Sequence, residues 1–130
     1  MSLIRNLAGF LDDTGVGTVG SYIYLEELPA EPADALMLVS MVSPEPDQYL
    51  NTQTLDFAIW SRNKSTKTGS DKLTECFLLL HRYHHLTLGD YHIFFIGALG
   101  NIESLGKDIE GRSLAKINFR AIYKDTRTVS

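Results

Sequence analysis

The segment from Ala35 to Val42 constrains the fold more than any other part of the chain. Every position in it except Ser40 carries an apolar side chain, and Pro44 and Pro46 stop the run. Successive side chains of a strand point to opposite faces of the sheet. A strand that is apolar on both faces must therefore be covered on both faces. The segment therefore predicts a central strand, with helix over one face and a second subunit or a bent-over sheet over the other.

Four other segments are typical of strands, because β-branched and aromatic residues cluster or alternate in them. They are Tyr22 to Leu25, Leu55 to Ser61, Tyr91 to Ala98 and Ala115 to Tyr123. The alternation in Leu55 to Ser61 predicts a half-buried strand. The last segment alternates apolar with polar residues, which is typical of an antiparallel strand with one face solvated or paired to a partner.

Two segments repeat apolar residues at helical spacing. The first, Leu3 to Leu11, follows Ser2 as a possible N-cap and predicts a short amphipathic helix. The second is expected to begin at Asp71, with Ser70 as its cap, and to end at Gly89. Its predicted buried stripe consists of Leu73, Cys76, Phe77, Leu80 and His84.

These elements predict an α+β fold for residues 1–130 as a single domain. We expect a mostly antiparallel sheet of about four to five strands with two helices packed on one face. Two polar or glycine-rich stretches, Ser61 to Ser70 and Gly97 to Gly111, are predicted to be exposed loops. Residues 125–130 have little apolar content and are expected to form a loose C-terminal tail.

Composition excludes several classes of protein. The formal net charge of −4 predicts weak non-specific affinity for nucleic acid or anionic membranes. No apolar stretch approaches the roughly 20 residues that span a bilayer. Residues 1–11 lack the layout of a signal peptide, so synthesis inside the cell is expected. The lone Cys76 cannot form an internal disulfide.

No motif in the chain predicts catalysis or cofactor binding. Gly15 to Gly20 matches G-x-G-x-x-G, but a helix is predicted before it and a strand after it, the reverse of a dinucleotide site. The neighbouring acids Asp12 and Asp13, like Glu26 and Glu27, are not placed to share a proton. A Gly-x-Ser-x-Gly elbow is also absent from the sequence. The expectation is a protein that is not an enzyme, without catalytic or cofactor-binding residues.

The candidate metal ligands are His81, His84 and His85, which lie within five residues, and His92, which completes the set of histidines in the sequence. Zinc would want further ligands from Cys, Asp or Glu in convergent geometry. His84 is instead expected to complete the apolar face of the second helix, whose C-terminus suits histidines. The sequence therefore favours no metal site. A metal- or small-ligand-binding regulatory domain that uses the His81 to His92 region remains the alternative.

The order of the elements and three stretches carry a resemblance to a known family. The stretches are Leu55 to Ser61, the helix from Asp71, and Asp108 to Arg112 running into Ile117 to Tyr123. The chain resembles the minor capsid or tail-terminator (tail-completion) proteins of tailed bacteriophages and prophages, mainly over residues 53–124.

The resemblance implies a non-enzymatic virion protein, made in the bacterial host cytoplasm. It would form a homo-oligomeric ring, expected to be a hexamer, that caps the tail tube and joins it to the head connector. The implied partners are the tail tube protein and the head-tail connector proteins, with DNA passing through the ring without tight specific binding. The candidate partner-facing residues, which lie in or next to the two predicted loops, are Arg62, Lys64, Lys67, Asn101, Lys107, Asp108, Glu110 and Arg112.

Overall fold

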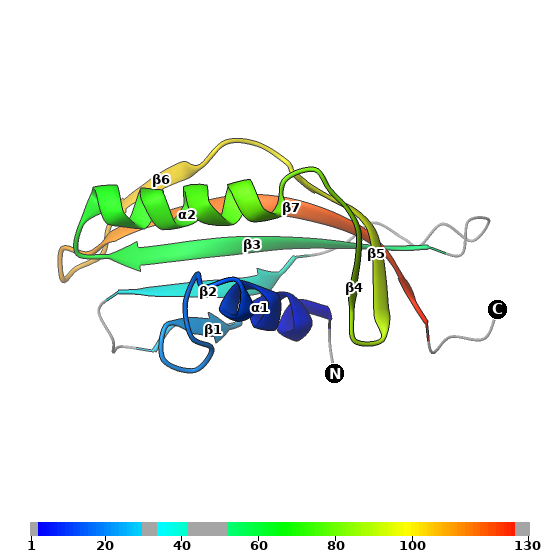
Figure 1. Cartoon of the computed structure of the whole chain (residues 1–130). Helices are drawn as coiled ribbons and strands as arrows, with labels where there is room; N and C mark the ends of the chain where they lie inside the picture. Colours follow the sequence, from blue (N-terminus) through cyan, green and yellow to red (C-terminus); the bar gives the residue numbers. More distant parts are fainter. Residues whose placement is uncertain (1–2, 30–33, 42–51, 127–130) are drawn as a thin grey trace.

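A computed structural model describes residues 3–29, 34–41 and 52–126 of the chain (Figure 1). Its elements in order are α1 (Leu3–Asp13), β1 (Ile23–Leu25), β2 (Ala35–Ser40), β3 (Gln53–Asn63), α2 (Thr66–Leu80), β4 (Tyr83–Leu88), β5 (Tyr91–Ala98), β6 (Glu103–Lys107) and β7 (Ser113–Asp125). The predicted cap Ser2, the end of the apolar run at Val42, the stops Pro44 and Pro46, and tail residues 127–130 lie outside the described residues.

The strands form one seven-stranded mixed sheet in the order β1-β2-β3-β7-β5-β4, with β6 paired to β7. β1 and β2 are parallel, and the remaining pairs are antiparallel. The α+β prediction is confirmed, but the expected four to five antiparallel strands must be corrected. The strands that were not predicted, β4 and β6, lack a buried alternating face, so their sequences carry little of the signal from which strands are predicted.

The core lies between the sheet and the two helices, which cover the same face (Figure 1). α1 packs on β1 and β2, and α2 packs on β3 and β7. At the centre, Phe57 of β3 and Phe119 of β7 are directly opposite each other, fully buried and stacked, with ring centroids 5.4 Å apart. Burial of these two aromatic rings contributes to the hydrophobic stabilisation of the fold.

β2 is flanked by β1 and β3, as its apolar sequence predicts. Leu36 and Leu38 point into the core and are fully buried, whereas Met37 and Val39 are half-buried on the other face. β3 is longer than predicted and is buried over Asp56 to Ile59 on both faces. Its position between β2 and β7 explains the added burial.

α2 begins at Thr66 and not at Asp71, so the predicted loop from Ser61 to Ser70 is wrong. Ser65 is the N-cap, and its Oγ accepts a hydrogen bond from the Thr68 N–H at 3.2 Å. Residues 61–63 complete β3. The first turns of α2 present polar residues to solvent. Such a stretch lacks an apolar stripe, so its sequence is typical of a loop.

α2 ends at Leu80, well before the predicted stop at Gly89. The His81 side chain stacks on Phe77, and its Nδ1 accepts a hydrogen bond from the Ala98 N–H at 3.0 Å. The chain then reverses through Arg82, whose φ of 60° is left-handed, and enters β4. His84 therefore lies on an edge strand and does not complete a helical stripe.

The β4–β5 hairpin turns at Gly89, which has a positive φ of 57°. β5 matches the predicted strand at Tyr91 to Ala98. In Figure 1 the hairpin crosses the direction of β3, and Asn6 of α1 donates a hydrogen bond to the Leu88 carbonyl. The sheet thus curls far enough for β4 to reach α1.

The stretch from Gly97 to Gly111, predicted to be a loop, contains β6, whose residues are all exposed. β6 and β5 pair with successive halves of the long strand β7. β7 runs to Asp125, and Thr126 donates two hydrogen bonds to the Asp90 carbonyl. No helix in the described part of the chain is long and apolar enough to cross a membrane.

Candidate partner-binding surfaces

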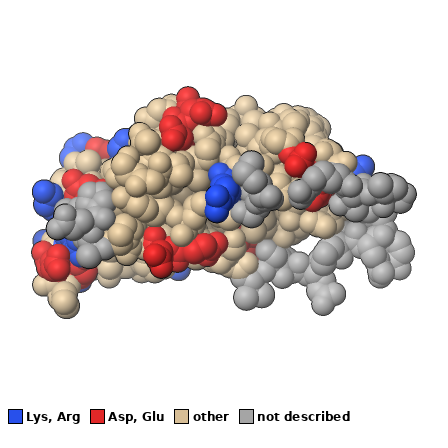
Figure 2. Space-filling model, turned by 90° about the horizontal axis from the view of Figure 1, so that it is seen from below, with Lys and Arg blue, Asp and Glu red and all other residues tan. Residues whose placement is uncertain are grey.

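All but one of the predicted contact residues gather where β3 ends, α2 begins and β6 turns into β7, at the left of Figure 1. We call this region the charged end. It consists of Arg62, Lys64, Lys67, Lys107, Asp108, Glu110 and Arg112. The exception is Asn101, which lies in the β5–β6 connection and contacts a different cavity. Figure 2 shows that Lys and Arg gather beside Asp and Glu at the left of that view, whereas the charged residues elsewhere on the face are mainly Asp and Glu.

Asp108 organises the turn between β6 and β7. Its Oδ1 accepts hydrogen bonds from the N–H groups of Glu110 at 3.0 Å and Arg112 at 2.9 Å. Its Oδ2 accepts one from Arg112 Nε at 2.8 Å. The Arg112 N–H has the largest effect among the bonds that hold the pKa of Asp108 below its ordinary value. The turn is therefore tied at both ends and presents a fully exposed Ile109 at its tip.

Arg62 belongs to the charged end by its position, but its side chain is buried and is not offered to solvent. It is only 5% exposed, and its Nη2 donates a hydrogen bond to the Pro29 carbonyl at 2.7 Å. Burial, followed by the nearby Arg112, lowers the pKa of its guanidinium. Arg62 was expected to lie in an exposed loop, and this expectation fails because the residue belongs to the central strand β3.

The three lysines of the charged end are exposed. The Lys64 backbone N–H donates to Asp34 Oδ1 at 2.9 Å, which places the chain between β3 and α2. Lys67 Nζ lies 2.7 Å from Asp71 Oδ2, but both side chains are mostly exposed. An ion pair of this kind is easily exchanged for another partner because water screens it.

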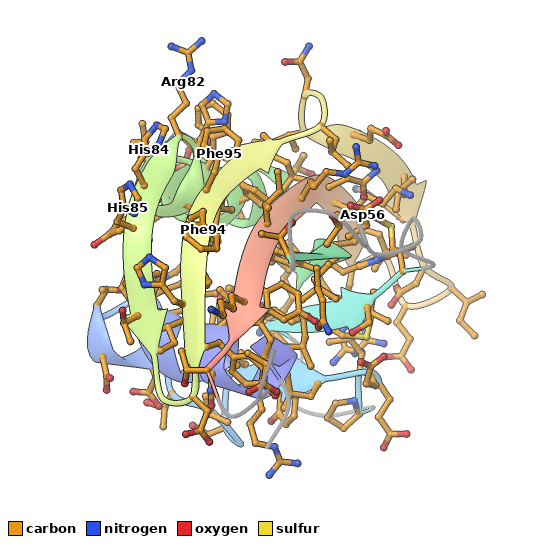
Figure 3. All side chains as sticks on the ribbon, turned by 90° about the vertical axis from the view of Figure 1, so that its right-hand side faces the viewer. Asp56, Arg82, His84, His85, Phe94 and Phe95 are labelled. Atoms are coloured by element: carbon orange, nitrogen blue, oxygen red, sulfur yellow. The ribbon has the colours of Figure 1, made fainter. Side chains whose placement is uncertain are left out.

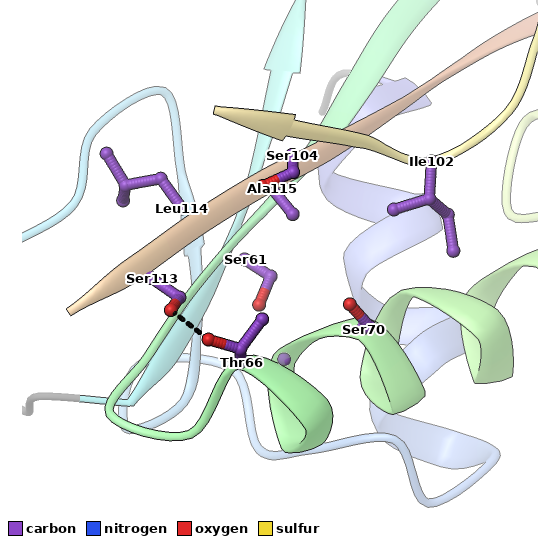
Figure 4. Close-up of a pocket in the computed structure, with 9 residues that line it drawn as sticks. Ser61, Thr66, Ser70, Ile102, Ser104, Ser113, Leu114 and Ala115 are labelled. Carbon is purple, nitrogen blue, oxygen red and sulfur yellow. Dashed lines mark hydrogen bonds between the residues drawn. The ribbon is translucent and has the colours of Figure 1, made fainter. Parts of the chain in front are cut away.

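Behind the charged end lies a cavity of about 260 Å³ (Figure 4). Across its mouth Thr66 Oγ1 and Ser113 Oγ are 2.6 Å apart. The cavity is lined by Ser61, Thr66, Gly69, Ser70, Ile102, Ser104, Ser113, Leu114 and Ala115. None of these lining residues titrates near neutral pH, so the cavity holds hydroxyl groups without a base to activate them.

A second surface is apolar and was not predicted. A cavity of about 320 Å³ is lined by Phe77 and Thr74 of α2, Ile117 of β7 and residues 100–102 of the β5–β6 connection. Leu78 and Leu99 adjoin these residues in the chain and are 75% and 49% exposed. We call Phe77, Leu78, Leu99 and Ile102 the apolar patch. The sequence signal for this patch is the run Leu78-Leu79-Leu80. Three successive leucines of a helix cannot all face one core, so one of them must be exposed.

The glycine motif does not form a phosphate cradle. Gly15 and Gly20 have positive φ values of 88° and 93° within the connection from α1 to β1. The N–H groups of Gly15, Val16 and Gly20 donate to carbonyl oxygens of the chain itself. Among the residues that the structure describes, no group of three or more His, Cys, Asp or Glu could hold a metal ion.

On the sheet face opposite the helices, charged residues pair across the central strands. Asp56 and Arg120 are directly opposite each other, with Arg120 Nε 2.7 Å from Oδ1 and Nη2 2.9 Å from Oδ2 (Figure 3 labels Asp56). Lys116 lies over the ring of Trp60, which is also its direct neighbour in register. These cross-strand contacts stabilise the pairing of β3 with β7.

Comparison with known proteins assigns the chain to a family. The model of a family described as bacteriophage tail terminator protein matches residues 10–125, which is most of the chain. A search of curated proteins finds no match. The family match confirms the resemblance to tail terminators and covers both the charged end and the apolar patch. The chain therefore belongs to the bacteriophage tail terminator protein family, whose members are structural proteins of the phage tail.

Proposed function

We propose that the protein caps the phage tail tube as a closed ring of identical subunits and links the tube to the head connector. The observation that carries the proposal is the presence of two separate exposed surfaces of different chemistry, the charged end and the apolar patch. A ring subunit on a tube needs contacts of two kinds, to its own copies and to the tube. Closed symmetry also explains how apolar contacts can form without producing open-ended fibres.

The apolar patch is proposed to contact a second copy. Leu78 and Leu99 expose large apolar side chains, and their chain neighbours Phe77 and Gly100 line a cavity that could receive a side chain from a neighbour. Apolar residues of this size at the centre of a contact contribute most to stable association, because their burial removes apolar area from water. Leu78 lies on the outer surface of α2, so its replacement should not disturb the core.

The charged end is proposed to contact the end of the tail tube. Lys64 and Lys67 are exposed, and the turn held by Asp108 presents Ile109 and Glu110 in a fixed conformation. Charges of both signs on a rigid support select a partner with the complementary pattern and accelerate the encounter. The net charge of −4 also suits a ring through which DNA passes without being held.

Molar mass by light scattering, with and without tail tube protein, tests the proposal. The untagged protein should form a discrete oligomer, either alone at high concentration or on the tube protein. Leu78→Lys should prevent self-association, whereas Val19→Lys, at an exposed position in the connection from α1 to β1, should not. Circular dichroism of both variants checks that they are folded.

A double variant of the charged end separates the two surfaces. Lys64→Glu combined with Lys67→Glu should keep the self-association of the wild type and weaken binding to the tube protein. A protein that stays monomeric under all these conditions and never binds tube ends would contradict the proposal.

A further inference from the structure

The β4–β5 hairpin, at the end of the molecule away from the charged end (Figure 1), carries five aromatic or imidazole rings that contact one another in pairs, and Figure 3 labels four of them. They belong to His84, His85, His92, Phe94 and Phe95. The register of β5 against β7 shifts between Ile93 and Phe95, which makes Phe94 an inserted residue. As a result Ile93 and Ile96 are both buried, and the two phenylalanines between them both lie on the outer side.

His85 lies opposite this bulge with a left-handed φ of 56°. Histidine adopts this conformation more often than most residues, but it remains uncommon outside glycine. The conformation brings the side chain of His85 to the same face as that of His92 on the neighbouring strand. His85 Nδ1 and His92 Nε2 are 3.4 Å apart, and the two ring centroids are 5.6 Å apart.

The distance between these two nitrogens fits a shared metal ion. Zinc binds imidazole nitrogen at about 2.0–2.1 Å in tetrahedral geometry, which separates two ligating nitrogens by about 3.3 Å. The observed 3.4 Å is therefore close to the separation expected for two ligands of one ion.

Neighbouring side chains orient both rings. His92 Nδ1 lies 3.0 Å from Thr87 Oγ1, so its N–H can donate to the hydroxyl and leave the lone pair of Nε2 directed at His85. Phe94 makes edge contacts with the rings of His85 and His92, with interplanar angles near 80°. Supporting contacts of this kind fix the tautomer and the ring orientation of metal-binding histidines.

The sequence favoured no metal site for two reasons, the lack of further Cys, Asp or Glu ligands and the placement of His84 on the apolar face of a helix. The structure removes only the second reason, because His84 lies on β4, and it also reduces the candidate set. His81 Nδ1 already accepts a hydrogen bond from the Ala98 N–H, and the His81 ring stacks on Phe77. His84 packs beside Phe95, with ring centroids 5.1 Å apart.

We propose that His85 and His92 together bind one divalent transition-metal ion, with the remaining coordination positions taken by water or by a donor from another molecule. Imidazole suits Zn²⁺, Ni²⁺ and Cu²⁺, whereas Mg²⁺ and Ca²⁺ prefer oxygen. The site is independent of tube capping, because it lies on a different part of the surface. The one thiol does not compete, because Cys76 is fully buried and its pKa is raised to about 12.

Isothermal calorimetry of the untagged, metal-free chain with Zn²⁺ and with Ni²⁺ tests the proposal. The wild type should bind one ion per chain, and Mg²⁺ should give no heat. His85→Asn, which tolerates the left-handed backbone, and His92→Gln should each weaken binding at least about tenfold. His84→Gln is the matched control and should bind like the wild type.

Thermal unfolding gives a second readout that does not depend on heats. Saturating Zn²⁺ should raise the unfolding midpoint of the wild type and of His84→Gln, because the ion binds only the folded state. It should not raise the midpoint of His85→Asn or His92→Gln. Absence of binding by the wild type, or equal binding by all four proteins, would overturn the proposal.

Discussion

Asp108 binds Arg112 with both carboxylate oxygens, one on the backbone N–H at 2.9 Å and one on the side-chain Nε at 2.8 Å. Arg112 in turn places its Nη2 3.4 Å from Glu110 Oε2. Gly111, with a φ of 78°, lets the chain close the turn between them. This relationship makes the tip of the charged end a preformed structure, as a surface that recognises one partner needs.

Replacing Asp108 should therefore loosen the turn in a pH-dependent way. Hydrogen bonds hold the folded-state pKa of Asp108 below its unfolded value of about 3.9, so its stabilising effect is present above that pH and is lost as pH falls through the folded pKa. Asp108→Asn should lower the thermal unfolding midpoint at pH 7, and the difference from the wild type should shrink below about pH 4. A difference that stays constant over this range would contradict the assignment.

The N-terminus of α2 gives a test that separates the sequence prediction from the structure. Ser65 caps the helix, so Ser65→Ala should lower the free energy of unfolding by about 1 kcal/mol. Ser70, the cap expected from the sequence, lies inside the helix, so Ser70→Ala should be neutral or slightly stabilising. Urea unfolding of both variants measures the two changes in the free energy of unfolding. A larger loss for Ser70→Ala than for Ser65→Ala would contradict a helix that begins at Thr66.

The error at this helix has a simple physical origin. The stretch from Ser65 to Ser70 contains no large apolar residue, and its inward position is occupied by Gly69. Hydrophobic periodicity therefore begins only at Leu73, where the helix is already under way. The central strands were predictable for the opposite reason: Phe57, Ile59, Ile117 and Phe119 alternate into one buried face.

Gly69 should resist substitution because α2 lies close to β3 there. A Cβ on Gly69 would lie 2.8 Å from Ser61 Oγ, whereas a Cβ on Gly9 of α1 would meet nothing within 4 Å. Both alanine variants gain helix propensity, so Gly9→Ala should stabilise by about 0.5–1 kcal/mol. Gly69→Ala should be less stable than Gly9→Ala by about 1–3 kcal/mol, the usual cost of overpacking. Equal stabilisation of the two variants in urea unfolding would show that the helix is free to shift.

Cys76 should be inert in the folded protein. The side chain is fully buried, and burial raises its pKa to about 12, so almost no reactive thiolate is present at pH 8. A thiol reagent such as DTNB should therefore label the native chain only at the rate at which it opens, and should label it rapidly in denaturant. Fast stoichiometric labelling of the native chain would contradict this packing of α2.

The candidate surfaces were predictable only where a local motif defines them. The stretch from Asp108 to Arg112 is one of those that carry the family resemblance, and its acidic, glycine and arginine residues lie within five positions. The apolar patch joins Leu78 to Leu99, and the histidine pair joins His85 to His92 across two strands. These pairings depend on where α2 ends and on the bulge at Phe94, which periodicity does not reveal.

Electron microscopy of assembling tail tubes tests the proposed capping most directly. Tail tube protein should be polymerised with and without the gold-labelled chain, and the tube lengths and label positions measured. The account predicts shorter tubes with label at one end, and loss of that label with the Lys64→Glu, Lys67→Glu variant. Label along the tube walls, or unchanged tube lengths with unlabelled ends, would contradict it.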